Sequence, residues 1–265
     1  MRSVLLFLSA GLTLFAEIIE TPHFRDLEGH VSSDSLVILD IDDTLLIPTQ
    51  TLGCDVWFVH QLMLNELDGK SADPLDKTLA LWEAIRHLTQ IQIVEPDSER
   101  LVEKMQKEGI SVMGLTTQGL ALATRTVNQL LSLDIDLSRT APSKEDCYFL
   151  NEHGVLFRRG ILFTSGTDKG EALLKFLDLA NYRPKKVVFI NDKRKHLEQV
   201  EQALQKKGIP FTGLRYSYSD QRIANYRPEI AEIQLRYSSL ERILSDAEAD
   251  RILSESIEEI TNSSE

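Results

Sequence analysis

The chain is poor in cysteine and in aromatic residues. Of its 265 residues, two are cysteines and 7% are aromatic. Cys54 and Cys147 allow one disulfide in an oxidising compartment, and two unpaired, partly buried thiols fit the same count equally well. No Cys/His spacing typical of a structural zinc site occurs in the sequence. Cysteine content therefore leaves the pairing open and gives no indication of zinc.

Clustered positive charge is also scarce. The formal net charge is −12, and the only dense basic run is Lys193-Arg194-Lys195. A protein that tracks a nucleic-acid backbone needs a basic patch or stripe, so we predict no nucleic-acid partner. A small anionic substrate remains compatible with the composition, because the charge inside a pocket governs its binding and the global charge does not.

The sequence lacks an apolar run long enough for an ordinary membrane-spanning helix. Its start combines Met1-Arg2 with an apolar stretch that ends at Ala16, which is the pattern of a signal peptide. We predict a signal peptide over residues 1–16, export to the periplasm or the medium, and no stable membrane insertion after cleavage. Leu14 fits the small-residue cleavage rule poorly, so an uncleaved anchor and a buried N-terminal helix are the alternatives.

Three short apolar runs indicate buried strands. They cover residues 36–39, 110–115 and 186–190, and helical stretches at 98–109 and 170–182 precede the second and third. Continuous apolar runs separated by helices are typical of a parallel sheet covered on both faces. A chain with 42% hydrophobic residues is also long enough to bury a full core. We therefore predict an α/β fold with a Rossmann-like parallel sheet flanked by helices.

Several further segments define the expected organisation. The interval after the first strand is too long for a simple crossover and shows helical periodicity at 56–67 and 75–88, so we interpret it as a helical cap. A β-hairpin is expected over 148–163, another strand at 209–214 and helix from 228 to 253, with Ser245 as a capped start. The predicted parts are a core (17–44 and 109–228), the cap (45–108) and a C-terminal helical extension with an acidic tail (229–265).

Polar side chains stand where the predicted strands end. Asp40 and Asp42 follow the first strand, Thr116 ends the second and Asp192 follows the third. Ligands bind at the carboxyl ends of parallel strands. Two neighbouring acids can divide the roles of nucleophile and proton donor, a divalent cation such as Mg²⁺ prefers oxygen ligands, and Lys169 and Thr116 can stabilise charge on phosphoryl oxygens.

These residues carry a family resemblance. Asp40-Ile-Asp42-Asp-Thr44 resembles the DxDxT motif of the haloacid dehalogenase superfamily, and Thr116, Lys169 and Asn191-Asp192 resemble its second, third and fourth motifs. The order and spacing agree over residues 36–214. The wording of the first motif, the export signal and the cap position are similar to the secreted acid phosphatases of this superfamily, and the rest is similar to an uncharacterised bacterial group of haloacid-dehalogenase-like proteins.

The resemblance implies a phosphohydrolase that acts on a small phosphate ester. Asp40 would attack phosphorus to form an aspartyl-phosphate, and Asp42 would protonate the leaving alcohol and then activate water. Mg²⁺ would be held by the Asp40 carboxylate, the backbone carbonyl of Asp42 and Asp192. Transfer of the phosphoryl group to an alcohol instead of water is an open variant, as are the substrate and the oligomeric state.

One departure favours a different class of function. Many relatives have two acids in the fourth motif, whereas this chain has Asn191 before Asp192. The missing negative charge is expected to lower metal affinity. The alternative is therefore a catalytically silent fold of the same superfamily, used as a binding or host-interaction module.

Overall fold

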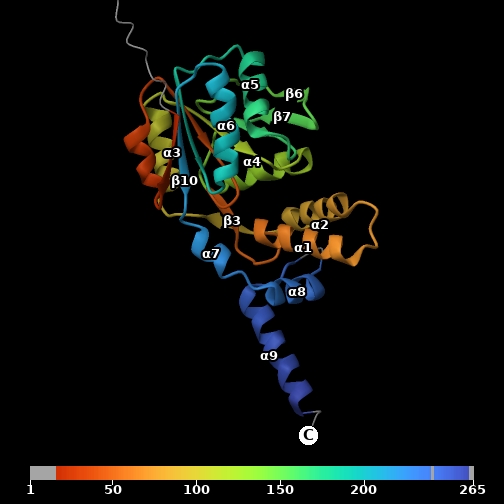
Figure 1. The fold of residues 1–265 in the computed structure, drawn as a ribbon. Helices are drawn as coiled ribbons and strands as arrows, with labels where there is room; N and C mark the ends of the chain where they lie inside the picture. The colour runs from red at the N-terminus through yellow and green to blue at the C-terminus, as the bar shows by residue number, and fades with distance from the viewer. Residues whose placement is uncertain (1–15, 240–241, 263–265) are drawn as a thin grey trace, which may run out of the picture.

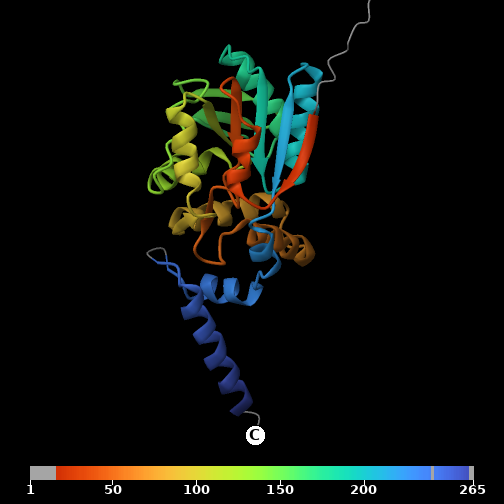
Figure 2. The same cartoon turned by 90° about the vertical axis from the view of Figure 1, so that its left-hand side faces the viewer.

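Within the described residues the central sheet has eight strands, and five of its seven neighbouring strand pairs are parallel (Figures 1 and 2). The computed structural model describes residues 16–239 and 242–262. From one edge to the other the strands are β1 (Ala16–Thr21), β10 (Phe211–Tyr216), β9 (Lys186–Asn191), β2 (Ser35–Leu39), β5 (Ser111–Thr116), β8 (Ile161–Phe163), β7 (Gly154–Arg158) and β6 (Cys147–Leu150). The predicted α/β class with a mostly parallel sheet is confirmed.

Both faces of strand β2 are covered, which explains its unbroken apolar run. Val37 and Leu39 pack into a core cluster with residues of α3 (Ser98–Lys107) and α4 (Ala123–Leu131). Leu36 and Ile38 face the opposite cluster, which contains residues of α5 (Lys169–Leu179) and α6 (Arg194–Lys206). Because successive side chains of a strand point to opposite faces, only a continuous apolar sequence fills both cores.

The expected strands and the hairpin are confirmed. β2, β5, β9 and β10 cover the apolar runs within two residues, and β6 pairs antiparallel with β7 across the turn at 151–153. From β2 the chain passes to β5 on one side, and it later returns to β9 on the other side. The order thus reverses at β2, and such a switch point is where ligands bind in sheets of this type.

Two antiparallel helices, α1 (Asp55–Asp68) and α2 (Pro74–Leu88), lie below the carboxyl ends of the strands (Figure 1). A short ribbon of β3 (Leu46–Pro48) and β4 (Ile91–Ile93) connects them to the sheet. Trp57 and Trp82 lie in the same apolar cluster between the helices. The cap boundary at residue 108 stays a prediction, and α3 within that range packs its apolar side chains onto the sheet.

The C-terminal segment forms two long helices where the sequence predicted one helical stretch. After α7 (Asp220–Ala224), α8 (Pro228–Tyr237) ends at Ser238, whose side chain accepts a hydrogen bond from the backbone of Leu244. Ser245 and Glu248 then cap each other at the start of α9 (Asp246–Asn262), as predicted. α8 packs under the cap, and α9 extends away from the rest of the molecule (Figure 2).

Two elements near the N-terminus are not predicted from the sequence. The stretch 16–21 forms edge strand β1, and a 3₁₀ helix follows at Phe24–His30. The sequence patterns predict neither element, because their apolar segments are short. The predicted signal peptide lies outside the described residues except for Ala16. None of the described helices combines the length and apolarity that a membrane crossing requires.

Both cysteines have free thiols. Cys54 is buried at the start of α1, where its sulfur accepts a hydrogen bond from the backbone N–H of Trp57, and Cys147 begins β6. The two alternatives left open by the sequence are thus resolved in favour of unpaired thiols. Burial raises the pKa of the Cys54 thiol to about 11, so it carries no charge at neutral pH.

Candidate active site

Asp40 and Lys169 form a buried ion pair at the carboxyl end of β2. The Lys169 ammonium lies 2.6 Å from Asp40 Oδ1 and also donates to the backbone carbonyl of Leu115 at 3.0 Å. Lys169 is the first residue of α5, and its side chain is 1% exposed. The lysine is therefore shielded from solvent, although it lies at the start of a helix. The backbone N–H of Asp40 donates to Ile190 of β9, which fixes the loop after β2 against the neighbouring strand.

Thr116 ends β5 with its side chain buried. Its Oγ1 accepts a hydrogen bond from the backbone N–H of Gln118 at 3.1 Å, an arrangement that turns the chain away from the sheet. Neighbouring Thr117 uses its backbone carbonyl to accept from Gly166. Thr116 can donate its hydroxyl proton while it accepts from Gln118, so it stays available for a phosphoryl oxygen.

Asp42 is held by two residues that sequence reasoning missed. Arg86, in the last turn of α2, places Nη2 2.7 Å from Asp42 Oδ1, and Gln118 donates to Oδ2 at 2.6 Å. Gln118 is itself fixed by the hydroxyl of Thr126. Burial raises the pKa of the Asp42 carboxyl, and the Arg86 charge acts in the opposite direction. The periodicity at 75–88 predicts a helix, but no pattern in the sequence indicates that its arginine reaches the sheet.

Asp192 is buried beside this pair with an unsatisfied oxygen. It directly follows β9, it is 3% exposed, and its Oδ1 has no hydrogen-bond partner among the described residues. Burial and the nearby Asp40 charge raise its pKa well above the ordinary value. The side-chain oxygen of Asn191 accepts a hydrogen bond from the backbone N–H of Lys193 at 2.7 Å. The asparagine thus shapes the loop that carries Asp192.

These groups fit the oxygen donors that Mg²⁺ prefers. Asp40 and Asp192 supply two carboxylates close enough for the charge of one to act on the other, and the free oxygen of Asp192 is the buried, unpartnered acceptor that a cation would satisfy. Across the described residues, no three acidic, histidine or cysteine side chains gather around one point. The third protein ligand implied by the resemblance is the backbone carbonyl of Asp42.

A second ion pair connects the cap to the same loop. Asp55, the first residue of α1, pairs with Lys193, the residue after Asp192. Burial acts to raise the pKa of Asp55, but the charge and hydrogen bond of Lys193, together with the charge of Arg86, lower it overall. The Asp55 charge in turn raises the pKa of Lys193. Burial and the neighbouring Lys169 and Lys193 lower the pKa of His196 to about 2, so its ring is neutral and cannot serve as a proton donor near pH 7.

Asp43 is buried in a left-handed backbone conformation with φ of 58°. Arg222 of α7 lies 3.3 Å from its Oδ1 and also donates to the carbonyl of Pro48. Burial, reinforced by the Asp55 charge, raises the pKa of Asp43 to about 7. Sequence reasoning left Asp43 out of the site, and the structure places it beneath the cap as a titrating group.

The raised pKa of Asp43 predicts a pH-dependent stability. The folded state keeps this proton up to about pH 7, whereas the unfolded state loses it near pH 4. Wild-type stability should therefore fall between these pH values, by at most about 4 kcal/mol from this group. Asparagine tolerates the left-handed conformation, so Asp43→Asn should remove this part of the slope in urea titrations. Exposed Asp34→Asn is the matched control, and equal slopes for wild type and Asp43→Asn would contradict the assignment.

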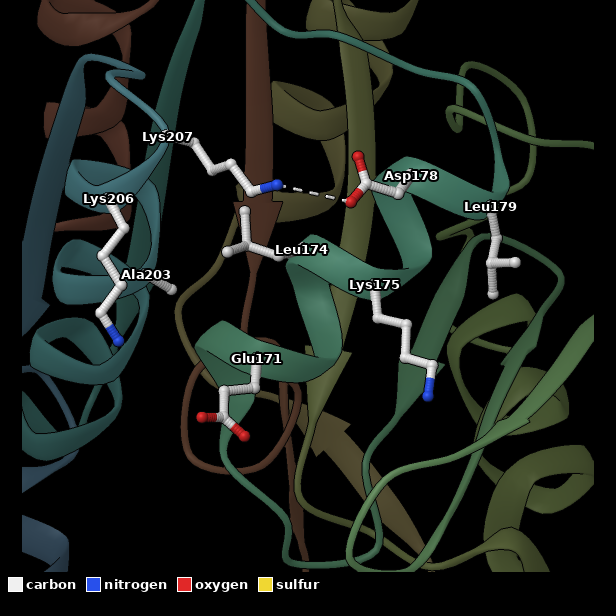
Figure 3. Close-up of a pocket in the computed structure, with 8 residues that line it drawn as sticks. All are labelled: Glu171, Leu174, Lys175, Asp178, Leu179, Ala203, Lys206 and Lys207. Carbon is white, nitrogen blue, oxygen red and sulfur yellow. Dashed lines mark ion pairs between the residues drawn. The ribbon is translucent and has the colours of Figure 1, made fainter.

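Two surface hollows lie away from this site. One of about 490 Å³ lies between α5 and α6, where Lys207 pairs with Asp178 (Figure 3). Another, of about 470 Å³, is lined by residues of α7, α8 and α9 and by the loop before α1. Neither is lined by Asp40, Asp42 or Asp192.

The strand order and the flanking helices place the chain in the α/β class. Its candidate active site consists of buried acids at the switch point of the sheet, next to the helical cap. The chain belongs to the family described as "Protein of unknown function (DUF2608)", whose sequence profile matches residues 20–250. Two relatives come from bacteria. One is a Chlamydia pneumoniae protein named "Putative outer membrane protein", 28% identical over 218 residues, with 82% of this chain and 81% of the relative covered. The other is a Rickettsia prowazekii protein named as uncharacterized, 26% identical over 229 residues, with 82% and 81% covered.

Solved structures that are similar to the chain include hydrolases of the haloacid dehalogenase superfamily. One is a haloacid dehalogenase-like hydrolase from Streptococcus pneumoniae, with a TM-score of 0.41 and 11% identity over 69% of this chain and 95% of that protein. A likeness this distant supports no argument about chemistry. The α/β class rests on the strand order of the chain itself.

Proposed function

We propose that the protein is a Mg²⁺-dependent phosphohydrolase of the haloacid dehalogenase type. The observation that supports this most strongly is the buried Asp40–Lys169 pair at the switch point of the sheet, next to Asp192 with its unpartnered oxygen. The buried carboxylates of Asp40 and Asp192 repel each other, which is costly. A site that binds a cation and a phosphoryl group would explain why two acids lie side by side here.

In the proposed reaction, an Asp40 oxygen attacks the phosphorus of a phosphate ester. The bond from phosphorus to the alcohol oxygen breaks, and Asp42 gives its proton to that oxygen. Lys169 and Thr116 hold the phosphoryl oxygens as negative charge builds up on them. Asp42, now ionised, takes a proton from water, the hydroxide oxygen attacks the phosphorus of the aspartyl-phosphate, and phosphate leaves with Asp40 regenerated.

The residues that would hold Mg²⁺ are Asp40, Asp192 and the backbone carbonyl of Asp42. When bound, the ion would offset the negative charge of the phosphate group and of the two carboxylates. Asn191 has a neutral amide, and its oxygen already accepts a hydrogen bond from the backbone N–H of Lys193. We therefore expect Asn191 to make no contact with the ion.

Export is part of the same proposal. Residues 1–16 have a signal-peptide pattern, and the Chlamydia pneumoniae relative is named as an outer membrane protein, which is compatible with a location outside the cytoplasm. We propose a periplasmic or secreted protein that acts on small phosphorylated molecules.

Turnover of a broad panel of phosphate esters, with and without Mg²⁺, tests the proposed function. We expect hydrolysis that requires the metal and that chelation abolishes. Lack of hydrolysis across the panel by a folded protein would leave the alternative, a silent binding module. The Arg86–Asp42 ion pair is the observation that favours this alternative, because it occupies the proposed proton donor.

A further inference from the structure

Arg86 is the most unusual charged group in the structure. It comes from the cap, it is 1% exposed, and its guanidinium lies 5.3 Å from the centre of the Trp82 ring. Burying a guanidinium this fully is costly unless its donors are used. Its Nη1 has only a long contact of 3.5 Å to the carbonyl of Gly53, and its Nε has no hydrogen-bond partner among the described residues.

The other cations near the site are more fully used. Lys169 binds both Asp40 and a backbone carbonyl, Lys193 pairs with Asp55, and Arg222 binds both Asp43 and a backbone carbonyl. Arg86 therefore has donor capacity to spare beside the proposed reaction centre. A planar guanidinium with free N–H groups suits a carboxylate or a phosphate, which it can bind with two parallel hydrogen bonds.

The position of Arg86 is the second observation. Its Nη2 lies 2.7 Å from Oδ1 of Asp42, the proposed proton donor to the leaving alcohol. The guanidinium therefore stands on the side of the site where the alcohol part of a phosphate ester would lie.

We propose that Arg86 recognises a second anionic group, a carboxylate or a phosphate, on the alcohol part of the substrate. The inference rests on the proposed phosphohydrolase function and specifies its substrate class. Arg86 is then a specificity residue supplied by the cap. Esters with an uncharged alcohol part would lack this contact.

Binding of phosphonates tests this subsite without requiring catalysis, because their carbon–phosphorus bond is not hydrolysed by this chemistry. The ligands are methylphosphonate and 3-phosphonopropionate, which adds a carboxylate, each titrated by calorimetry with Mg²⁺ present. Wild type should bind 3-phosphonopropionate more tightly by roughly tenfold or more, the effect of one charge-assisted pair. Arg86→Gln should remove the preference. Equal binding, no binding of either ligand by wild type, or a preference that survives in Arg86→Gln overturns the proposal.

Two further variants control for folding and charge. Arg86→Lys keeps the positive charge but loses the planar fork, so it should retain part of the preference if the glutamine variant fails to fold. Arg227→Gln is the matched control, since Arg227 is exposed and pairs with Glu229 and Asp250 far along the chain from Arg86. The control should keep the wild-type preference. Complete loss of preference in Arg227→Gln would show a general effect of charge and overturn the assignment to Arg86.

Turnover separates this inference from the function on which it rests. For esters with a carboxylate on the alcohol part, Arg86→Gln should lower kcat/KM by roughly 100-fold, because the charge-assisted contact is lost. For p-nitrophenyl phosphate, which lacks that carboxylate, the loss should be at least about tenfold smaller. Equal losses on both substrates overturn the inference and leave the phosphohydrolase standing. A phosphonate preference that depends on Arg86 without hydrolysis of any ester refutes the phosphohydrolase and leaves an anion-binding site.

Discussion

Replacing Asp40 by asparagine should reduce hydrolysis of an aryl phosphate by at least ~10³-fold, as is usual when a nucleophile that works with partner groups is removed. The amide is nearly the same size as the carboxylate but has no negative charge with which to attack phosphorus. Initial rates at saturating Mg²⁺ measure the effect.

The interpretation requires that the variant stays folded. Asp40→Asn leaves the buried Lys169 ammonium without its 2.6 Å partner and at the same time relieves the repulsion on Asp192, so its melting temperature must be compared with wild type. Asp40→Glu is a second variant, which keeps the charge but moves the carboxylate by one methylene group. The exposed Asp34→Asn is the matched control and should keep full activity. Wild-type rates in folded Asp40→Asn would contradict the role of Asp40.

Replacing Asp192 by asparagine should stabilise the metal-free protein and remove its response to Mg²⁺. The folded-state pKa of Asp192 is raised well above the ordinary value of 3.8. Its ionisation therefore costs stability progressively as the pH rises from the unfolded pKa to the folded pKa. Above this range the variant escapes the cost. It also lacks the charge that the ion needs.

Thermal unfolding with and without Mg²⁺ at pH 7.5 measures both effects. At an Mg²⁺ concentration 100-fold above its dissociation constant, wild type should gain about 2.7 kcal/mol, or roughly 5–10 °C for a chain of this size. Asp192→Asn should gain almost nothing. An equal rise in melting temperature for both proteins would mean that the ion binds elsewhere.

The fold and the central residues of the site followed from local sequence patterns. The run at 36–39 can only be buried on both faces, and the polar residues after three such runs had to meet at one edge of the sheet. Lys169 could be placed near them only through the family resemblance. The structure indeed brings it to Asp40 over 129 positions of sequence separation.

The contacts between cap and core could not be predicted in the same way. The periodicity at 75–88 predicts a helix, but the pairing of Arg86 with Asp42 depends on how that helix packs across the sheet, and no local pattern encodes this packing. The same applies to the ion pair between Asp55 and Lys193, which lie 138 positions apart in the sequence. A buried arginine in an otherwise amphipathic helix can be recognised as unusual only when its surroundings are known.

Asn191 shows how a departure from a motif can have a structural cause. In the sequence it appears as a missing metal ligand. In the structure its oxygen accepts from the backbone N–H of Lys193, and its amide nitrogen lies 3.5 Å from Nδ1 of His196. The residue thus stabilises the loop that presents Asp192. Asparagine at this position therefore fixes the loop, and we also expect it to lower the affinity for the ion.

The most direct test of the account is detection of the covalent intermediate. Wild-type protein is mixed with Mg²⁺ and an aryl phosphate, quenched in acid within the first turnovers, digested and examined by mass spectrometry. The account predicts a peptide that contains Asp40 and carries one added phosphoryl group, which is absent from Asp40→Asn. Hydrolysis of the ester without any phosphoryl group on Asp40, or with the group on another residue, would contradict it.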